Sequence, residues 1–209
     1  MTLRLVETAL EGARQAGAEV EVVDLASLRI HDCKGCGACY KTGRCPQDDD
    51  FGYVMGRIAA ADGVVLGSPA YFDSVTPRMM TLMDRMSDAI HCQRLRGRYG
   101  CSVCPAGTGG EGRVVGYMNG FLVACGASVT GGTGAALGSD PGAIDRAAEA
   151  AHAMGMDLAA AIREKRVYPD QADRHRAIMK WLRCRIVANK EPWAHDYFYW
   201  AQQGWLLSD

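Results

Sequence analysis

Short apolar runs alternate with longer segments of helical periodicity along the first 165 residues, and this alternation restricts the possible folds most. Four runs predict strands: AEVEVVDL (18–25), GVVLGSP (63–69), YGCSVCPAG (99–107) and the weaker ASVTGGT (127–133). The intervening segments predict helices at 3–16, 48–62, 76–90, 111–125 and 141–164. This order predicts an α/β fold, a parallel sheet with right-handed crossovers and helices on both faces.

Ligands of such sheets bind beyond the carboxyl ends of the strands, which here places them at loops 26–48, 67–76 and 105–112. The front of the sequence departs from the usual order. A sheet of this kind begins with a strand whose turn into the first helix holds phosphate on backbone N–H groups. Here the sequence begins at that helix, so we expect the first strand and its phosphate loop to be missing.

Composition excludes several classes of protein. A net charge of −1 over 209 residues gives no reason to expect a nucleic-acid partner or an anionic membrane. No apolar run approaches the roughly 20 residues of a membrane span, so we expect no membrane partner. The charged N-terminus MTLRLVETALEGARQAG does not resemble a signal peptide, which predicts a cytoplasmic protein with reduced thiols.

Four cysteines lie within thirteen residues in a segment that we call the cysteine loop, residues 33–45. Cys33, Cys36, Cys39 and Cys45 form C-x2-C-x2-C-x5-C followed by proline. Four thiolates are the usual ligands of a [4Fe-4S] cluster, and glycines between them let the backbone wrap closely around one. The sequence therefore predicts that these four cysteines bind a single cluster.

Two alternatives stay open for this loop: a structural zinc ion or no metal. Zinc sites also use four cysteines, but usually as two pairs separated by a longer spacer. The other five cysteines are scattered and are interpreted as small buried hydrophobic residues: Cys92, Cys101, Cys104, Cys125 and Cys184. None of the five histidines follows a metal-ligand or nucleophile–base pattern, so none is assigned a catalytic role.

The composition changes after Lys165. Residues 166–209 contain all four tryptophans and predict two helices. We interpret this segment as a helical extension that packs on the domain of residues 1–165 or on a second subunit, because large aromatic side chains are typical of cores and interfaces. The alternative is an aromatic wall over a cofactor site.

Taken in order, these segments resemble the flavodoxin-like NAD(P)H-dependent FMN reductases, and within them the iron-sulfur flavoproteins. Three stretches carry the resemblance: CKGCGACYKTGRCPQDDD, GVVLGSPAYFDSVTPRMMTLMDRM and ETALEGARQAGAEVEVVDL. It covers residues 2–165 and departs from the family at the front, where a phosphate loop is expected just upstream of Thr2. The resemblance implies a flavodoxin-like flavin-binding domain over residues 1–165.

The resemblance also implies an FMN site. We expect contacts from the SPAYFDS loop (residues 68–74) and from the glycine loop AGTGGEGR (residues 106–113). The expected FMN-binding residues are Ser68, Pro69, Ala70, Tyr71, Phe72, Ser74, Thr108, Gly109 and Gly110. A plain strand-to-helix connection is the alternative for the SPAYFDS loop. Asp84 and Arg85 are expected to form a structural ion pair or a subunit contact.

The function that this implies is electron transfer between NAD(P)H or a reduced carrier, FMN and a [4Fe-4S] cluster. FMN and the cluster carry out the redox chemistry, so no catalytic acid, base or nucleophile is assigned. Expected partners are NAD(P)H as substrate, a small-molecule or protein electron donor or acceptor, and further copies of the chain in a homodimer or homotetramer. The alternative is a non-catalytic flavodoxin-like scaffold whose cysteine loop holds zinc or nothing.

Overall fold

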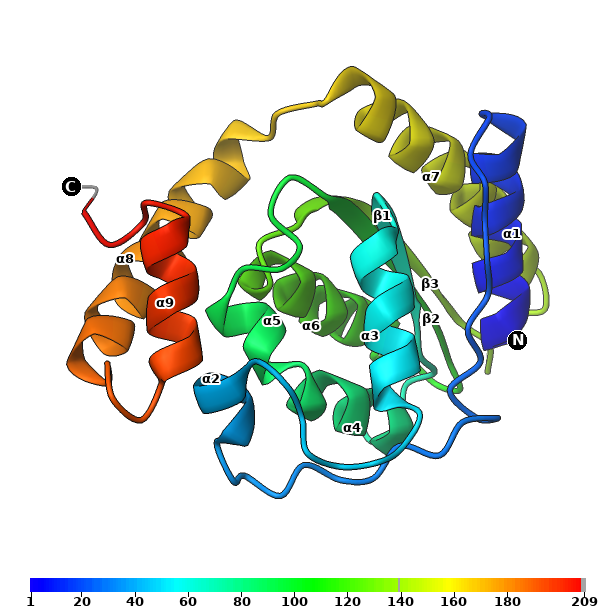
Figure 1. Ribbon diagram of the computed structural model, residues 1–209. Coiled ribbons are helices and arrows are strands. Elements are labelled where there is room, and N and C mark those ends of the chain that lie inside the picture. Colours follow the sequence, from blue (N-terminus) through cyan, green and yellow to red (C-terminus); the bar gives the residue numbers. More distant parts are fainter. Residues whose placement is uncertain (139, 208–209) are drawn as a thin grey trace.

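A computed structural model describes residues 1–138 and 140–207 (Figure 1). Within this part, three parallel strands form one sheet in the order β1-β2-β3, with β1 at Gly63–Gly67, β2 at Tyr99–Ala106 and β3 at Ser128–Ala136. The helices are α1 (Thr2–Gln15), α2 (Ala38–Thr42), α3 (Phe51–Ala60), α4 (Pro77–Arg85), α5 (Ser87–His91), α6 (Glu111–Ala124), α7 (Ala143–Glu164), α8 (Pro169–Ala188) and α9 (Ala194–Gln202). The predicted α/β fold is confirmed.

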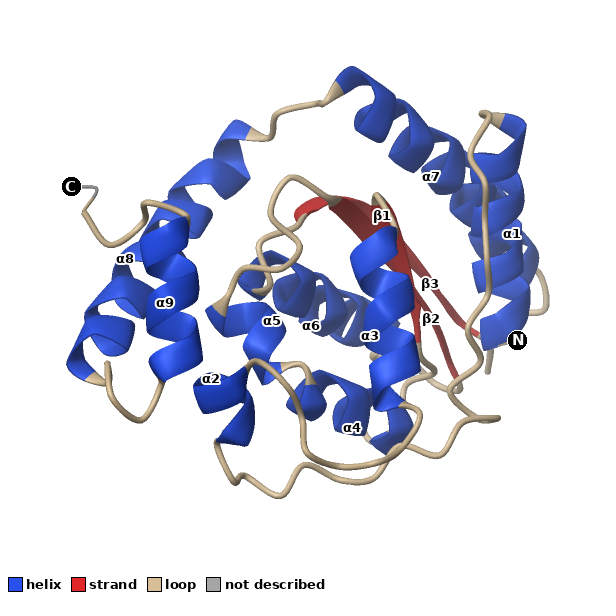
Figure 2. Ribbon diagram, in the orientation of Figure 1, coloured by secondary structure: helices blue, strands red, loops and turns tan. Residues whose placement is uncertain are grey.

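Helices cover both faces of the sheet (Figures 1 and 2). On β2, Val103 packs in a cluster with residues of α1 and α7, while the next residue, Cys104, packs in a second cluster with residues of α3, α4 and α6. This alternation follows from the two-residue period of a strand. Helices α1 and α7 approach so closely that a side chain at Gly155 would collide with the backbone of Ala9.

Residues 18–25 do not form the strand that the sequence predicts. The segment is extended, but the structure assigns it no strand partner, and β1 pairs only with β2 in the described part of the sheet. A strand needs a neighbour to accept and donate its backbone hydrogen bonds. In the predicted topology, the neighbour of residues 18–25 would be the first strand of the sheet. Without such a neighbour, residues 18–25 stay outside the sheet, and Val22 is exposed.

Two further details differ from the predicted elements. The helix expected at 76–90 is divided into α4 and α5 at Met86, and the short α2 interrupts the cysteine loop. The helical extension contains the two predicted helices, whose buried core consists of Leu182, Ile186 and Trp200. None of the described helices is both long enough and apolar enough to cross a lipid bilayer.

Candidate functional site: two loops joined by helix α4

The SPAYFDS loop follows β1 and folds back on itself in a tight turn. Tyr71 and Ser74 exchange backbone hydrogen bonds of 2.9 and 3.1 Å, and the two residues between them, Phe72 and Asp73, have φ angles of 53° and 60°. Two successive left-handed residues define a type I′ turn, which is uncommon without glycine or asparagine. Strained backbone of this kind concentrates at binding and active sites.

The turn exposes the aromatic side chains that the sequence singled out. Tyr71 is 60% exposed and Phe72 is fully exposed, whereas Ser68 is buried and its Oγ accepts a hydrogen bond of 3.0 Å from the backbone N–H of Thr76. Ser68 therefore stabilises the base of the loop rather than presenting its hydroxyl. The tip of the loop offers two aromatic side chains with no partner surface of their own in the described structure.

The glycine loop lies beside this turn at the carboxyl end of β2. Asp73 pairs with Arg113 at 3.1 Å, and a side chain at Gly110 would collide with the carboxylate of Asp73. The contact brings the two predicted FMN loops together. Gly110 is the N-cap residue of α6 and has no side chain to accept a hydrogen bond, so the first N–H groups of that helix remain available at this junction.

This junction has the features that a flavin requires. Apolar and aromatic surface comes from Tyr71 and Phe72, and N–H donors come from the glycine loop and the first turn of α6. None of the N–H groups of Thr108, Gly109 and Gly110 donates to a backbone carbonyl among the described residues. Donors of this kind bind the polar edge of a ring or an anionic group.

The cysteine loop lies on the other side of α4. Cys33 and Cys36 are exposed, Cys39 and Cys45 are half-buried, and none of the four forms a disulfide. Left-handed backbone at Gly37 begins α2 and left-handed backbone at Gly43 ends it, so glycine conformation sets the positions of Cys39 and Cys45. Burial raises the pKa of the Cys39 thiol to about 11, with a smaller contribution from the negative charge of Asp88.

The four sulfur atoms are not arranged for a single metal ion. Among the described residues, one group of four Cys, His and Asp side chains has its ligand atoms within 4.8 Å of one another. That group lies elsewhere and contains none of these four cysteines. A cluster of four irons spaces its thiolates more widely than one zinc ion does. Among the described residues, these four cysteines therefore do not form a preformed zinc site.

A buried ion pair fixes both ends of the cysteine loop. Arg85, at the end of α4, donates to Asp49 at 2.7 Å and to the backbone carbonyl of His31 at 2.6 Å, and both charged side chains are at most 1% exposed. The Arg85 hydrogen bond holds the pKa of Asp49 down, to about 2. Arg85 thus forms the structural ion pair that was expected, but with Asp49 instead of the adjacent Asp84, and it also interacts with Cys45.

The helical extension packs on the domain and covers one side of the cysteine loop. Tyr40 of α2 stacks on His91 with ring centroids 4.2 Å apart, and Trp193 lies against both rings. Trp200 donates to the carbonyl of His91 at 2.7 Å. The segment therefore packs on the domain, and its aromatic side chains also contact the cysteine loop.

The scattered cysteines divide into two groups. Cys92, Cys101, Cys104 and Cys125 are buried, as predicted, but Cys184 is exposed on α8, so the prediction that it is buried is wrong.

Two features near the cysteine loop were not identified from the sequence. Asp49 lies in the predicted helix at 48–62, where its sequence position indicates no partner, and the histidines at 91 and 195 follow no ligand pattern.

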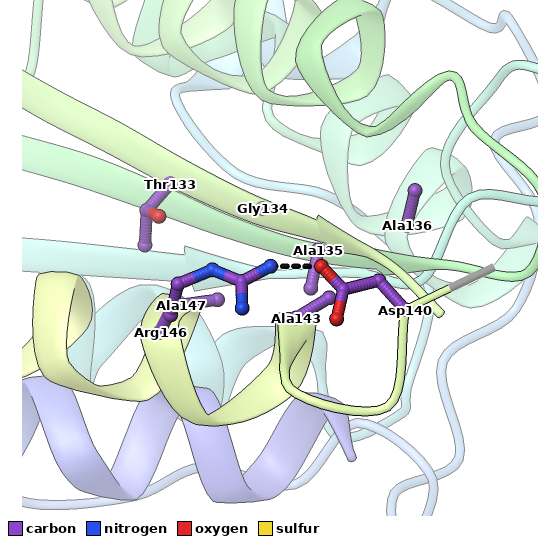
Figure 3. A pocket seen from close by; sticks show the side chains of 8 residues that line it. All are labelled: Thr133, Gly134, Ala135, Ala136, Asp140, Ala143, Arg146 and Ala147. Carbon is purple, nitrogen blue, oxygen red and sulfur yellow. Dashed lines mark hydrogen bonds and ion pairs between the residues drawn. The ribbon is translucent and has the colours of Figure 1, made fainter. Parts of the chain in front are cut away.

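One hollow of the described structure lies apart from these loops. It has a volume of about 420 Å³ between β3 and the start of α7, and Arg146 within it pairs with Asp140 (Figure 3). Its lining contains none of the predicted FMN or metal residues. Because Asp140 neutralises Arg146, the hollow offers no uncompensated cation for a phosphate.

Known proteins resemble this chain in sequence and in fold. Residues 1–142 match the family described as NADPH-dependent FMN reductase. The chain is 34% identical over 206 residues to an iron-sulfur flavoprotein of Archaeoglobus fulgidus, covering 97% of this chain and 92% of that protein. It is 32% identical over 124 residues to an iron-sulfur flavoprotein of Methanocaldococcus jannaschii, covering 58% of this chain and 64% of the relative.

Solved structures show the same architecture at lower identity. A flavone reductase superposes with a TM-score of 0.64 at 19% identity, over 78% of this chain and 58% of the other. A flavodoxin from the domain Archaea superposes with a TM-score of 0.53 at 13% identity, over 78% of this chain and 90% of the other. The fold is therefore flavodoxin-like. By its sequence, the chain belongs to the NADPH-dependent FMN reductase family and, within it, to the iron-sulfur flavoproteins.

Proposed function

We propose that this protein transfers electrons between NAD(P)H or a reduced carrier, FMN at the junction of the SPAYFDS and glycine loops, and a [4Fe-4S] cluster in the cysteine loop. FMN, when bound, exchanges two electrons with a nicotinamide and single electrons with an iron-sulfur cluster. The residues proposed to hold FMN are those predicted above, and the cluster ligands are Cys33, Cys36, Cys39 and Cys45.

The observation that carries this proposal is the position of α4. The helix begins at Pro77, three residues after the SPAYFDS loop, and at its other end Arg85 holds both flanks of the cysteine loop. Its nine residues correspond to about 13 Å of helix. In between, Thr81 donates to Asp32 at 3.1 Å. One rigid element therefore fixes the separation of the two proposed redox sites.

The chain's own residues position and shield these sites. Tyr71 and Phe72 offer aromatic surface to one face of a flavin ring, and the N–H groups of the glycine loop offer donors to its polar edge. The buried Arg85–Asp49 pair keeps the cysteine loop closed against α4. We also propose that the protein works in the cytoplasm, where a reducing environment keeps the loop thiols free, and that it assembles as a homodimer or homotetramer.

Anaerobic purification followed by flavin, iron and zinc analysis tests the assignment. Cys36→Ser should lose cluster iron and keep flavin, whereas Cys184→Ser, which removes an exposed cysteine on α8, should keep both. Zinc at the cysteine loop without iron would favour the alternative of a structural site, and a colourless protein without iron would contradict the proposal.

The flavin site is tested separately with Tyr71→Ala. We expect weaker retention of FMN and an unchanged iron content, because the exposed ring contacts the proposed flavin site and not the cysteine loop. Tyr53→Ala is the matched control, since Tyr53 is 52% exposed on α3. Equal loss of flavin in both variants would refute the assignment of Tyr71. Light scattering on the holoprotein measures the oligomeric state.

A further inference from the structure

A compact group of four potential metal ligands lies beneath the cysteine loop, separate from its cysteines. Asp88 and Cys92 come from α5 and the residue after it, and His195 and Asp196 come from the first turn of α9. Their ligand atoms all lie within 4.8 Å of one another. Cys92 and Asp196 are fully buried, and the side chains of Asp88 and His195 are 17% and 26% exposed.

The distances within this group match a tetrahedral zinc site. The Cys92 Sγ lies 3.5 Å from Asp88 Oδ1 and 3.6 Å from Asp196 Oδ1. The His195 Nδ1 lies 3.7 Å and 3.5 Å from the same two oxygens. Around one Zn²⁺ with ligands at about 2.0–2.3 Å, neighbouring ligand atoms are roughly 3.3–3.8 Å apart. Four of the six edges of the tetrahedron therefore have the required length.

Both carboxylates direct the same oxygen toward the centre and use the other one elsewhere. Arg94 donates to the Oδ2 of Asp88 at 2.9 Å and, at a longer 3.4 Å, also to its Oδ1. The Oδ2 of Asp196 lies 2.7 Å from the Nδ1 of His91. Each Oδ1 faces the group. Outer partners that orient a ligand in this way are typical of metal sites.

The imidazole of His195 completes the argument. Its Nδ1 is buried and has no hydrogen-bond partner among the described residues, because 3.5 and 3.7 Å to the two carboxylates are too long. A buried polar atom without a partner is costly. A cation at the centre would accept its lone pair, while the other edge of the ring packs against Gly43 of the cysteine loop.

We propose that Asp88, Cys92, His195 and Asp196 bind one Zn²⁺ ion. The mixture of one sulfur, one nitrogen and two carboxylate oxygens suits zinc and excludes Mg²⁺ and Ca²⁺, which take oxygen ligands. Binding releases the thiol proton of Cys92 to solvent. The ion joins α5 to α9 and thereby fixes the helical extension against the cysteine loop. This site is independent of the proposed iron-sulfur cluster.

Cobalt titration of the full chain tests the site. The four loop cysteines are first replaced by serine (Cys33→Ser, Cys36→Ser, Cys39→Ser and Cys45→Ser), so that Co²⁺ cannot bind there. This variant should bind one equivalent of Co²⁺, with the visible bands of a tetrahedral ion, a thiolate charge-transfer band, and displacement by Zn²⁺. Adding Cys92→Ser should remove the charge-transfer band and weaken binding by about 100-fold or more.

Cys125→Ser is the matched control, because Cys125 is equally buried but lies outside the group. It should leave the Co²⁺ spectrum and affinity unchanged. If the folded four-serine variant, verified by circular dichroism, binds no Co²⁺, the proposal is overturned. It is also overturned if Cys92→Ser keeps the thiolate band.

A second measurement uses the native loop and does not depend on folding of these variants. The unmodified protein, produced with zinc in the medium, should contain one zinc per chain in addition to its iron. His195→Gln should lose the zinc and keep the iron. Equal zinc content in the two proteins would overturn the proposal, whereas loss of iron alone in Cys36→Ser leaves it intact and tests only the proposed function.

Discussion

Replacement of Asp49 by asparagine removes the charge that fixes the flanks of the cysteine loop. Asp49 is fully buried and accepts hydrogen bonds from Arg85, from the N–H of His31 at 2.9 Å and from the N–H of Phe51 at 3.1 Å. In Asp49→Asn an NH₂ group replaces one of the two acceptor oxygens and cannot accept from the donors that face it. Arg85 is then left as a buried cation without its counter-ion.

The magnitude follows from the pKa of Asp49, which is lowered from 3.8 to about 2 by its hydrogen bonds, chiefly that from Arg85. A lowering of this size corresponds to roughly 2–3 kcal/mol. Removal of one partner of a buried pair costs about 3–5 kcal/mol. We therefore expect Asp49→Asn to lower the free energy of unfolding at pH 7 by about 3 kcal/mol.

The pH dependence separates this mechanism from general damage to the core. The folded-state pKa is depressed, so the stabilisation is complete above the unfolded pKa and is lost as the pH falls from about 4 through about 2. Between pH 7 and pH 3 the linkage relation gives a loss of about 1 kcal/mol. The difference in unfolding free energy between wild type and Asp49→Asn should narrow by that amount.

Urea denaturation at the two pH values, monitored by tryptophan fluorescence in cluster-free protein, measures the difference. Asp145→Asn is the control, since Asp145 forms an exposed pair with Arg4 and such pairs contribute little. A difference that stays constant between pH 7 and pH 3 would refute the role of the Asp49 charge. So would an equal destabilisation in the control.

Three further predictions concern the cysteine loop, the helical extension and the turn of the SPAYFDS loop. Gly43→Ala should detach the cysteine loop from α9 and increase proteolysis of the loop, because Gly43 has a φ of 74° and a methyl group there would collide with His195. Gly35→Ala is the control: a methyl group there has no neighbour within 4 Å, so the contact of the loop with α9 should change less. Trp200→Ala should lower the free energy of unfolding by about 3–5 kcal/mol in urea denaturation, since the ring is fully buried. Asp73→Gly should relieve backbone strain and raise the melting temperature while weakening FMN retention, because the contact with Arg113 is lost; tighter FMN binding would contradict this role.

Local pattern predicted most of the fold. The apolar runs at β1, β2 and β3 and the periodic segments at α1, α6 and α7 carry their own signals, which do not depend on distant residues. The failure at residues 18–25 is different in kind. Strand formation there depends on a neighbouring strand, and the residues of the segment itself do not encode whether that neighbour is present.

The candidate site was predictable where its residues are contiguous. Four cysteines in thirteen residues, and a serine–proline loop after a strand, are local signals. The ion pair of Asp49 with Arg85, 36 residues apart, and the contact of Cys92 with Asp196, 104 residues apart, arise only from tertiary packing. The four-residue spacing of Asp88 and Cys92 was the one local signal for that group, and by itself it is too common to be specific.

The seating of the cysteine loop against α9 sets an order of events during synthesis. Residues 33–45 leave the ribosome long before α9 does, so the loop has no cover on this side until α9 has been made. Insertion of a cofactor into the open loop, followed by arrival of the last helix as a cover, requires no later opening of the folded protein. We expect a cofactor of this loop to enter before α9 packs against it.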